Sequence, residues 1–467
     1  MKVKIRFKMV KFLTTLRTHW KKSVFFTLAG AYGTHWAQLK YRENQLMTRF
    51  CQEASKYGQM PHHPDQPLYN VTVILNPAAS GGQGRQKFEN YCAPILNCAG
   101  LRVSVVRTEG IGEAKRLMEI MSEANAVLVA GGDGTLMETV SGLFKRNDAE
   151  TFGMAVPVGV LPVGRTNSMA RNLFPVAARD GLSEVELLAN AAMAVVKQVY
   201  RPVDVLQLEN LSEGDLQGRK LHAVSEFQMG AFKDAHRRMD KFWYLPKVKK
   251  FMTYVFAYST ASKDILWNCP ADLTLGNLGP IQDLIPMEAN NTRSWWSYLW
   301  PFPSQSSQAP PTFQTYWDEP QAYNGLEIRV QTPNVKPFEN KPTLKKLDIT
   351  LGPESMRFSE FVSEGYAREQ GSNTTDELET PFVHQKADRI RLNFQPDFAQ
   401  GREYFFNLDN EEVEMHGDLE ISLLADKFVM FCGSEAQLDL KANIDPNKGK
   451  WWQQRTGPSI ANLKQRL

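Results

Sequence analysis

The chain has 467 residues, of which 42% are hydrophobic, and its formal net charge is +3. This length allows two or three domains with sizeable cores. The near-balanced charge and the lack of a basic, aromatic stripe argue against a nucleic-acid partner. Five scattered cysteines without a CxxC pair fit neither a disulfide framework nor a zinc site.

The N-terminal segment, residues 1–42, contains ten Lys or Arg and no acidic residue. Apolar residues recur on one helical face, at Met9, Leu13, Leu16, Trp20 and Val24. Such a segment is typical of mitochondrial targeting or of a helix lying in a membrane interface. A solvated basic tail is the plainer alternative. Residues 43–66, which end in a His- and Pro-rich stretch, are expected to form a linker.

Residues 67–200 show strands alternating with helices. Strands are expected at 71–75, 101–106, 126–130 and 158–161, and helices at 85–98, 113–122, 136–144, 167–173 and 183–197. This rhythm predicts an α/β domain with a doubly wound parallel sheet, helices on both faces and right-handed crossovers.

Residues 201–440 have a different texture. Short alternating runs at 203–208, 221–228, 326–331, 347–351, 390–394, 420–424 and 428–432 predict a second, mainly antiparallel β-rich domain. A Pro- and Ser-rich insert, residues 279–321, carries Trp295, Trp296, Tyr298 and Trp300. Clustered tryptophans fit a membrane interface, and a hydrophobic plug on the domain is an equal alternative. Residues 441–467 are expected to form a tail.

Glycine-rich turns follow successive strands of the first domain, at 76–85, 107–110, 131–135 and 162–171. Ligands of open parallel sheets bind at the carboxyl ends of the strands. Glycine permits close backbone approach, and the N–H groups that start the next helix attract anions. These turns are neither a Walker A loop nor a dinucleotide GxGxxG, and together they predict a phosphate site.

Asp133 stands among these glycines, in VAGGDGT at 129–135. A carboxylate beside a phosphate is reasonable if a cation lies between them, and Mg²⁺ is held by one or two carboxylates together with substrate phosphates. The sequence therefore predicts a nucleoside triphosphate, Mg²⁺ and phosphoryl transfer. A turn or capping role for Asp133 is the alternative.

These motifs resemble a known signature. GGDGT at 131–135, the NPxxxG turn at 76–81 and PxGxxNxxAR at 162–171 are similar to the diacylglycerol kinase catalytic superfamily, which includes sphingosine, ceramide and, more distantly, NAD kinases. The stretches LRTHWKK, CQEA, APIL, PVDVLQ, GAFKDA and KFWYL resemble mitochondrial acylglycerol kinases over nearly the whole chain. The resemblance implies a nucleotide-binding α/β domain, a β-rich lipid-binding domain and a site between them.

The resemblance also implies site residues. The nucleotide side comprises Asn76, Gly84, Arg85, Thr108, Gly131, Gly132, Asp133, Gly134, Thr135, Gly164 and Asn167. Asp234 matches an acid near the lipid headgroup. Relatives carry Asp-Gly-Glu in a late hairpin, where this chain has Asp409-Asn410-Glu411. Asp409 is expected to be the base, with Asp133 as competitor, and Glu411 its partner or, with Asp133, a metal ligand. Arg165 departs from the family pattern and either meets a phosphate or faces solvent.

The activity implied is ATP-dependent phosphorylation of monoacylglycerol and diacylglycerol to lysophosphatidic and phosphatidic acid. The implied location is the mitochondrial inner membrane, facing the intermembrane space. A sphingosine or ceramide kinase is the alternative within this class. A second, non-enzymatic role follows from the same resemblance, as a subunit of the inner-membrane carrier translocase. Because a fold does not decide function, both roles stay open at this point.

Overall fold

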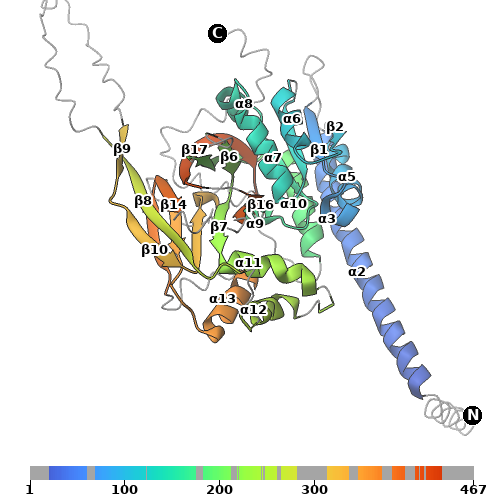
Figure 1. Cartoon of the computed structure of the whole chain (residues 1–467). Helices are drawn as coiled ribbons and strands as arrows, with labels where there is room; N and C mark the ends of the chain where they lie inside the picture. Colours follow the sequence, from blue (N-terminus) through green and yellow to red (C-terminus); the bar gives the residue numbers. More distant parts are fainter. Residues whose placement is uncertain are drawn as a thin grey trace, which may run out of the picture.

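The structure is a computed structural model (Figure 1). It describes residues 20–59, 69–122, 124–174, 182–211, 218, 220–242, 244–245, 248–259, 265–280, 313–335, 345–370, 381–394, 405–409, 411–414 and 417–433. Residues 1–19, Asn410, the tryptophan cluster of the insert and the tail 441–467 lie outside these ranges, so the expectations for them stay predictions.

The first described element is the helix α2, Trp20–Gly58. Its N-terminal half projects from the body of the molecule (Figure 1). Its C-terminal half packs on α5 (Ala93–Cys98) and α10 (Ser183–Lys197). No helix among the described residues is long and apolar enough to cross a membrane.

The linker expected at 43–66 was wrong in its first part, because residues 43–58 are helical. Ala54 is fully buried there. Partly buried residues of the same helix pack against the same core at three, four or seven residues from Ala54: Met47, Phe50, Cys51 and Tyr57. This spacing gives the helix an apolar face to bury. The expected linker started too early in the chain, because the helix continues to Gly58.

A four-stranded parallel sheet forms the centre of the α/β part. Its strands are β1 (Asn70–Leu75), β2 (Arg102–Arg107), β3 (Ala126–Gly131) and β4 (Val158–Pro162). They lie in the order β2-β1-β3-β4. The chain moves one way from β1 to β2 and the other way from β2 to β3 and β4. Right-handed crossovers therefore place their helices on opposite faces, as expected for a doubly wound sheet.

The helices form two groups. One contains α6 (Glu113–Ile120), α7 (Asp133–Phe144) and α8 (Ala149–Ala155), and the other contains α2, α5 and α10. The helix expected at 85–98 is divided into α4 (Gly84–Lys87), a π-helical turn (Phe88–Cys92) and α5. Pro94 lies just after the π turn and has no N–H to donate to the preceding turn. Short helices α3 (Ala79–Gly82) and α9 (Ser168–Leu173) follow β1 and β4.

The β-rich part consists of two facing sheets. The first extends the parallel sheet with β5 (Tyr200–Asn210), β6 (Lys220–Ala223), β8 (Cys269–Pro280), β9 (Phe313–Trp317), β10 (Gln321–Gly325), β14 (Arg389–Phe394) and β17 (Leu419–Phe431). The second contains β7 (Glu226–Gly230), β11 (Glu327–Gln331), β12 (Leu347–Leu351), β13 (Val383–Ala387), β15 (Phe405–Leu408) and β16 (Glu411–Glu414). An apolar core with Phe227, Ile328, Ile390 and Phe406 lies between them.

Three helices form a separate group with their own apolar cluster. They are α11 (Ala231–Arg237), α12 (Lys249–Ser259) and α13 (Phe358–Gln370), and Phe232, Tyr254 and Phe361 pack together among them. Two short 3₁₀ turns, Arg238–Phe242 and Pro333–Val335, complete the described elements.

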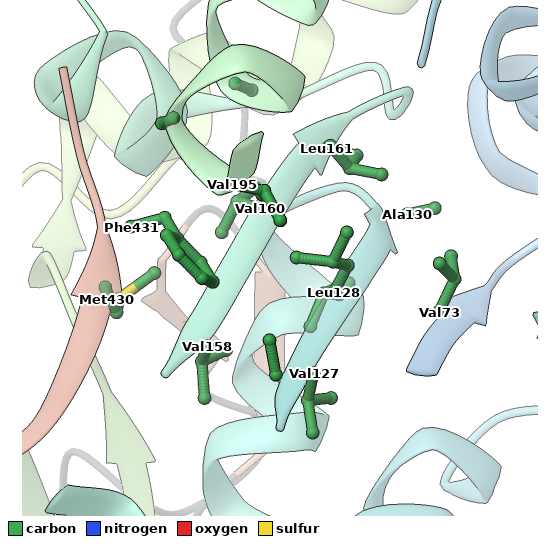
Figure 2. Packing of buried hydrophobic residues seen from close by; sticks show 14 of the residues in the cluster. Val73, Val127, Leu128, Ala130, Val158, Val160, Leu161, Val195, Met430 and Phe431 are labelled. Carbon is green, nitrogen blue, oxygen red and sulfur yellow. The ribbon is translucent and has the colours of Figure 1, made fainter. Parts of the chain in front are cut away.

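The strand β17 joins the two parts. It pairs with β5 along most of its length and with β14 at its start, and Met430 pairs with Val158 of β4. Met430 and Phe431 enter the core of the α/β part beside Val158 and Val195 (Figure 2). One continuous sheet therefore runs through both parts.

Some strand boundaries differ from the expectation. The run 221–228 is two strands, β6 and β7, which belong to different sheets. The runs 420–424 and 428–432 are one strand, with a register shift between Leu424 and Phe428. The ends of the insert 279–321 are also regular, because β8, β9 and β10 pair there.

Candidate active site

The turns after β1 and β3 meet at the point where the order of the parallel strands reverses, which is where ligands of this fold class bind. Asn76 follows β1, and its backbone N–H donates to Ala130 O at 2.9 Å. Its side-chain Nδ2 donates to Thr135 Oγ1 at 3.1 Å. The first glycine-rich turn and GGDGT are thus directly connected.

The first glycine-rich turn is left-handed. Ser80, Gly81 and Gly82 have φ values of 54°, 70° and 89°, a conformation that glycine adopts without steric penalty. A Cβ at Gly81 or Gly82 would meet no atom within 4 Å, so this turn is open on its outer side. At Gly84, by contrast, a Cβ would lie 2.6 Å from Asn76 O.

GGDGT packs backbone to backbone against the turn after β4. A Cβ at Gly164 would lie 2.3 Å from Gly132 Cα, so neither turn has room for a side chain here. Gly164 N donates to Gly131 O and Asp133 N donates to Thr166 O, both at 3.1 Å. These bonds fix the start of α7, whose first N–H groups have no partner inside the helix.

Asp133 is 2% exposed and lies at the centre of this arrangement. Its carboxylate accepts the backbone N–H groups of Ser168 at 3.0 Å and Met169 at 3.4 Å, at the start of α9. A capping contact of this kind was the alternative expected from the sequence. Asn167 Nδ2 donates to Gly164 O at 2.8 Å, while Asn167 Oδ1 is buried and has no hydrogen-bond partner among the described residues.

The β15–β16 hairpin brings a carboxylate from the β-rich part to GGDGT. Leu408 pairs with Glu411 at the end of the hairpin. The Gly134 N–H donates to the Glu411 carboxylate. A Cβ at Gly134 would lie 2.4 Å from the Glu411 carboxyl carbon. Glycine at this position is therefore what lets the hairpin reach the first turn of α7.

The electrostatics around Glu411 are dominated by partial burial, which raises its pKa. The nearby carboxylates of Asp133 and Glu138 also raise it, whereas Arg165 and the Gly134 N–H lower it. Arg165 is exposed. Its cationic side chain therefore lies within electrostatic reach of the proposed phosphate site.

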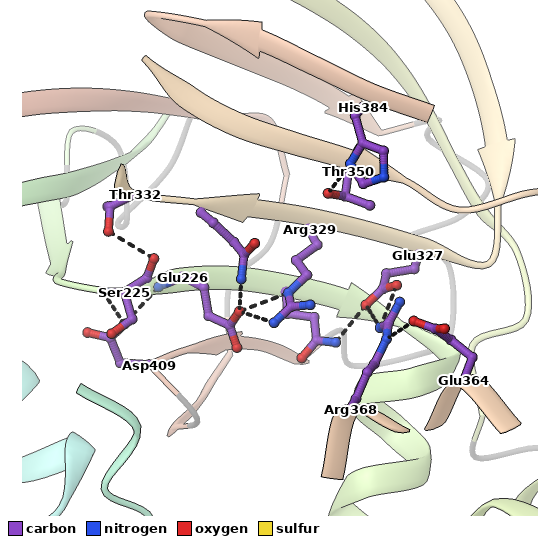
Figure 3. Close-up of polar contacts among 12 residues, drawn as sticks. Ser225, Glu226, Glu327, Arg329, Thr332, Thr350, Glu364, Arg368, His384 and Asp409 are labelled. Carbon is purple, nitrogen blue, oxygen red and sulfur yellow. Dashed lines mark hydrogen bonds and ion pairs between the residues drawn. The ribbon is translucent and has the colours of Figure 1, made fainter. Parts of the chain in front are cut away.

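Asp409 is the other acid of the hairpin, and it is 2% exposed. Its carboxylate accepts the N–H groups of Val224 at 2.6 Å, Ser225 at 2.7 Å and Glu226 at 2.9 Å, as Figure 3 shows in part. Burial raises the pKa of Asp409 to about 7 and Asp133 adds to this rise, while the three N–H groups oppose it.

The donors present fit a divalent cation bound together with a nucleotide. Asp133 and Glu411 are close enough to raise the pKa of Glu411 by repulsion, and a cation beside them would offset that repulsion. Mg²⁺ takes one or two protein carboxylates and completes its shell with phosphate oxygens and water. No group of three or more His, Cys, Asp or Glu side chains suited to a metal occurs in the described ranges.

Three predicted residues lie in other surroundings. Arg85 Nε pairs with Glu89 at 2.6 Å on the helix surface. Thr108 is buried, and its N–H donates to Leu75 O at 2.9 Å. The Asp234 side chain is 12% exposed and accepts the Leu266 N–H at 2.9 Å.

A row of charged pairs extends from the hairpin along the second sheet (Figure 3). Glu226 accepts Arg329 Nε at 2.8 Å, and the fully buried Glu327 accepts Arg368 Nη1 at 2.8 Å. Arg368 also donates to Glu364 at 2.8 Å. The row links the Asp409 turn through β7 and β11 to α13, and its members satisfy one another, as buried charges require.

Some residues of the site were not expected from the sequence. Thr166, Ser168 and Met169 act through backbone groups, which leave no side-chain signal. Lys233 forms an ion pair at 3.3 Å with Glu412 of the hairpin. The only signal for Lys233 is its place next to Asp234 in GAFKDA.

The chain matches two family models and several curated proteins. Residues 70–208 match the diacylglycerol kinase catalytic domain, and residues 224–444 match the acylglycerol kinase C-terminal model. The chain is 30% identical to "Acylglycerol kinase, mitochondrial" of Xenopus laevis, over 91% of this chain and 95% of that protein. It is 30% identical to the Homo sapiens protein of the same name, over 91% and 97%.

More distant matches are similar over less of the chain or at lower identity. Sphingosine kinase 1 of Homo sapiens is 29% identical over 37% of this chain and 44% of its own length. Among solved structures, a putative diacylglycerol kinase from Bacillus anthracis str. Sterne is 18% identical, with a TM-score of 0.46, and the match covers 80% of this chain and 100% of that one. The near full-length matches at 30% identity show that the chain is a lipid kinase and belongs to the acylglycerol kinase family.

Proposed function

We propose that the chain transfers the γ-phosphate of ATP to the free hydroxyl of monoacylglycerol and diacylglycerol, giving lysophosphatidic and phosphatidic acid. The observation that carries this proposal is the contact between Glu411 and Gly134. It places an acid from the β-rich part at the first turn of α7, where phosphate would bind. The relatives named acylglycerol kinase support the substrate class.

The nucleotide would lie over the turns after β1 and β3. The left-handed turn at Ser80–Gly82, which is open on its outer side, and the positive end of the α7 helix dipole suit the phosphates. Asp133 would hold Mg²⁺ together with the phosphates, and the ion would neutralise charge on them when bound. Asn76 and Thr135 keep the two turns together through their hydrogen bond.

The two acids of the hairpin suit different roles. Asp409 has a pKa near neutrality, which suits a base. Its oxygens are occupied by three backbone N–H groups, however, and it is enclosed. Glu411 is partly buried but more open to solvent than Asp409, and its carboxylate lies against the start of α7. We therefore favour Glu411 as the proton acceptor and Asp409 as the residue that fixes the turn, the reverse of the roles expected from the sequence.

In the proposed step, the lipid hydroxyl oxygen forms a bond to the γ-phosphorus and the bond to the ADP oxygen breaks. The hydroxyl proton passes to the Glu411 carboxylate, and ADP leaves with the electron pair of the broken bond. Little covalent chemistry is asked of the protein, since positioning and charge neutralisation supply most of the acceleration. Arg165 would add positive charge close to the transferred group.

The proposed location is the mitochondrial inner membrane, facing the intermembrane space. The relatives carry the word mitochondrial in their names, and α2 offers exposed aromatic residues that suit a lipid interface. The role as a subunit of the inner-membrane carrier translocase remains a second proposal. Co-purification of the Glu411→Gln variant with translocase subunits would support this role. Failure of the folded Glu411→Gln variant to co-purify with them would contradict a role that is independent of catalysis.

The assay uses the full chain, labelled ATP, Mg²⁺ and monoacylglycerol, diacylglycerol, sphingosine or ceramide in mixed micelles. We expect labelled lysophosphatidic and phosphatidic acid from the wild type and none from Gly132→Glu, because a Cβ there already lies 3.0 Å from Thr166 O and the added carboxylate would repel phosphate. Label only on sphingosine or ceramide would favour the alternative substrate class. No labelled lipid from a folded, ATP-binding wild type would contradict the acylglycerol assignment.

The role of Glu411 is tested by Gly134→Ala. The new Cβ would displace the Glu411 side chain, which is exposed and can move, so we expect kcat to fall about 10- to 100-fold. Gly33→Ala, where a Cβ meets no atom within 4 Å, is the matched control. Unchanged turnover in a folded Gly134→Ala chain would argue against a direct role for Glu411.

A further inference from the structure

Lys233 on α11 is a buried cation that the proposed mechanism does not use. Its side chain is 1% exposed. Nζ donates to Phe405 O at 3.0 Å, and it lies 3.1 Å from Asp234 Oδ1 and 3.3 Å from Glu412 Oε1. An ammonium has three donors and is costly to bury unless they are paired. Here three acceptors surround it, so its place is specified rather than accidental.

Two of these acceptors belong to the hairpin, one on each strand. Phe405 begins β15, and Glu412 lies in β16. The Phe405 ring centroid also lies 5.8 Å from Nζ, within the range of a cation–π contact. The third acceptor, Asp234, is itself held by the Leu266 N–H. Lys233 therefore ties both strands of the hairpin to α11.

The hairpin is fixed to the sheet at its turn by Asp409, but in the described residues strand pairing with β7 does not hold the end that begins at Phe405. Among the described residues, β15 pairs with β7 only at Asn407 with Gln228 and Leu408 with Phe227. β16 lies at the edge of the sheet and pairs with β15. A two-stranded hairpin is marginal by itself. Small displacements of this hairpin would move Glu411 directly.

We propose that Lys233 is a positioning residue, which holds the hairpin so that Glu411 stays against Gly134. This inference rests on the proposed role of the hairpin in phosphoryl transfer. Lys233 acts through Phe405 and Glu412, because an enclosed ammonium cannot reach the lipid or the nucleotide. Arg237 supports the same strand from outside, with Nη1 3.3 Å from Glu412 Oε1.

The test is Lys233→Met in the full chain, which keeps most of the apolar stem and removes the cation. We expect kcat to fall about 10- to 100-fold, the range for a misplacement near 1 Å, with the KM for ATP changed less than about twofold. Lys233→Arg keeps the cation, and we expect it to recover most of kcat. Lys386→Met is the matched control, since this 62% exposed lysine pairs with Asp348 at 3.5 Å on the same sheet.

A kcat in Lys233→Met equal to that of an active wild type would overturn this inference alone. Failure of Lys233→Arg to recover kcat in a chain of wild-type thermal stability would overturn it as well. If Lys233→Met does not fold, Glu412→Gln decides, because its side chain is 37% exposed and its replacement is mild. Reduced kcat with unchanged KM for ATP would then support the tie, and unchanged kcat would overturn it. An inactive wild type would remove the proposed function itself.

Discussion

Asp409 has a left-handed backbone, with φ at 48°, and a carboxylate enclosed by three backbone N–H groups. Aspartate tolerates this conformation better than most residues because its short polar side chain can hydrogen-bond locally. Here the side chain bonds to the turn between β6 and β7, so one residue shapes its own hairpin and fixes a neighbouring turn. The acid expected to perform chemistry therefore also has a structural reason to be there.

The pKa of Asp409 gives a stability prediction. It is about 7 in the folded chain, above the ordinary value of 3.8. Between these values the folded chain holds a proton that the unfolded chain has released, so this contribution to the free energy of unfolding falls as the pH rises from about 4 to 7 and is flat above. Asp409→Asn does not titrate. We therefore expect it to destabilise the chain more at pH 5 than at pH 8.

Urea unfolding of both chains at the two pH values measures this difference. Asn also loses an acceptor oxygen and is expected to destabilise at every pH, so only the change with pH tests the pKa. An equal destabilisation at pH 5 and pH 8 would show that the three N–H groups outweigh burial, because Asp409 would then be ionised in both states at both pH values.

At the scale of elements, α2 combines two different surfaces. Its C-terminal half buries Ala54 against the α/β core. Its N-terminal half leaves large apolar residues exposed by 60% or more: Trp20, Phe25, Leu28, Tyr32 and Trp36. Exposed aromatic and aliphatic residues gathered on one projecting segment indicate a contact with another surface. Trp and Tyr suit the interface of a bilayer, where the ring is apolar and the polar tip stays wet.

We expect the triple change Phe25→Ser, Leu28→Ser and Trp36→Ser to reduce sedimentation with anionic phospholipid vesicles at least about tenfold, since burying each such side chain is worth about 1.5–3 kcal/mol. Transfer to lipid in mixed micelles should be retained, because the site lies on other elements. Ile111→Ser is the control, as Ile111 is 97% exposed outside α2. Equal sedimentation of the triple variant and the wild type would remove α2 from the membrane contact.

At the scale of the whole molecule, β17 makes the two parts one structure. Its first residues pair with β14 of the β-rich part, and its last residues enter the α/β core. The GGDGT turn and the β15–β16 hairpin come from different parts, so their contact depends on how firmly β17 holds the two parts together. A change that weakens the packing or pairing of β17 would therefore affect both the GGDGT turn and the β15–β16 hairpin.

Phe431 tests this coupling, because it is fully buried at the end of β17. We expect Phe431→Ala to destabilise the chain by about 3–5 kcal/mol, as for other buried aromatic residues. Tryptophan fluorescence and circular dichroism should still follow one unfolding transition. Val383→Ala, at a 53% exposed position, should change stability by less than about 0.5 kcal/mol. Two separate transitions in Phe431→Ala would show that the parts unfold independently.

The sequence by itself determined the α/β part and the class of chemistry. Buried parallel strands are continuous apolar runs, so β1, β3 and β4 could be located from composition alone. The glycine-rich turns could be predicted as a phosphate site because parallel strands bring their carboxyl ends to one edge. The motifs around Asp133 and Asp409 also resemble a kinase signature, and the family matches confirm a lipid kinase.

Tertiary structure decided the rest. The pairing of β17 with both β5 and β4, and the split of 221–228 between two sheets, depend on contacts between segments far apart in the chain. The same holds for Glu411 against Gly134 and for Lys233 against Phe405 and Glu412. The spacing of apolar residues indicates which face of a helix or strand is buried, but it does not indicate which other element covers that face. The burial of Asp409 and the proposed roles of Glu411 and Lys233 depend on such distant contacts, so they could not be predicted from the sequence.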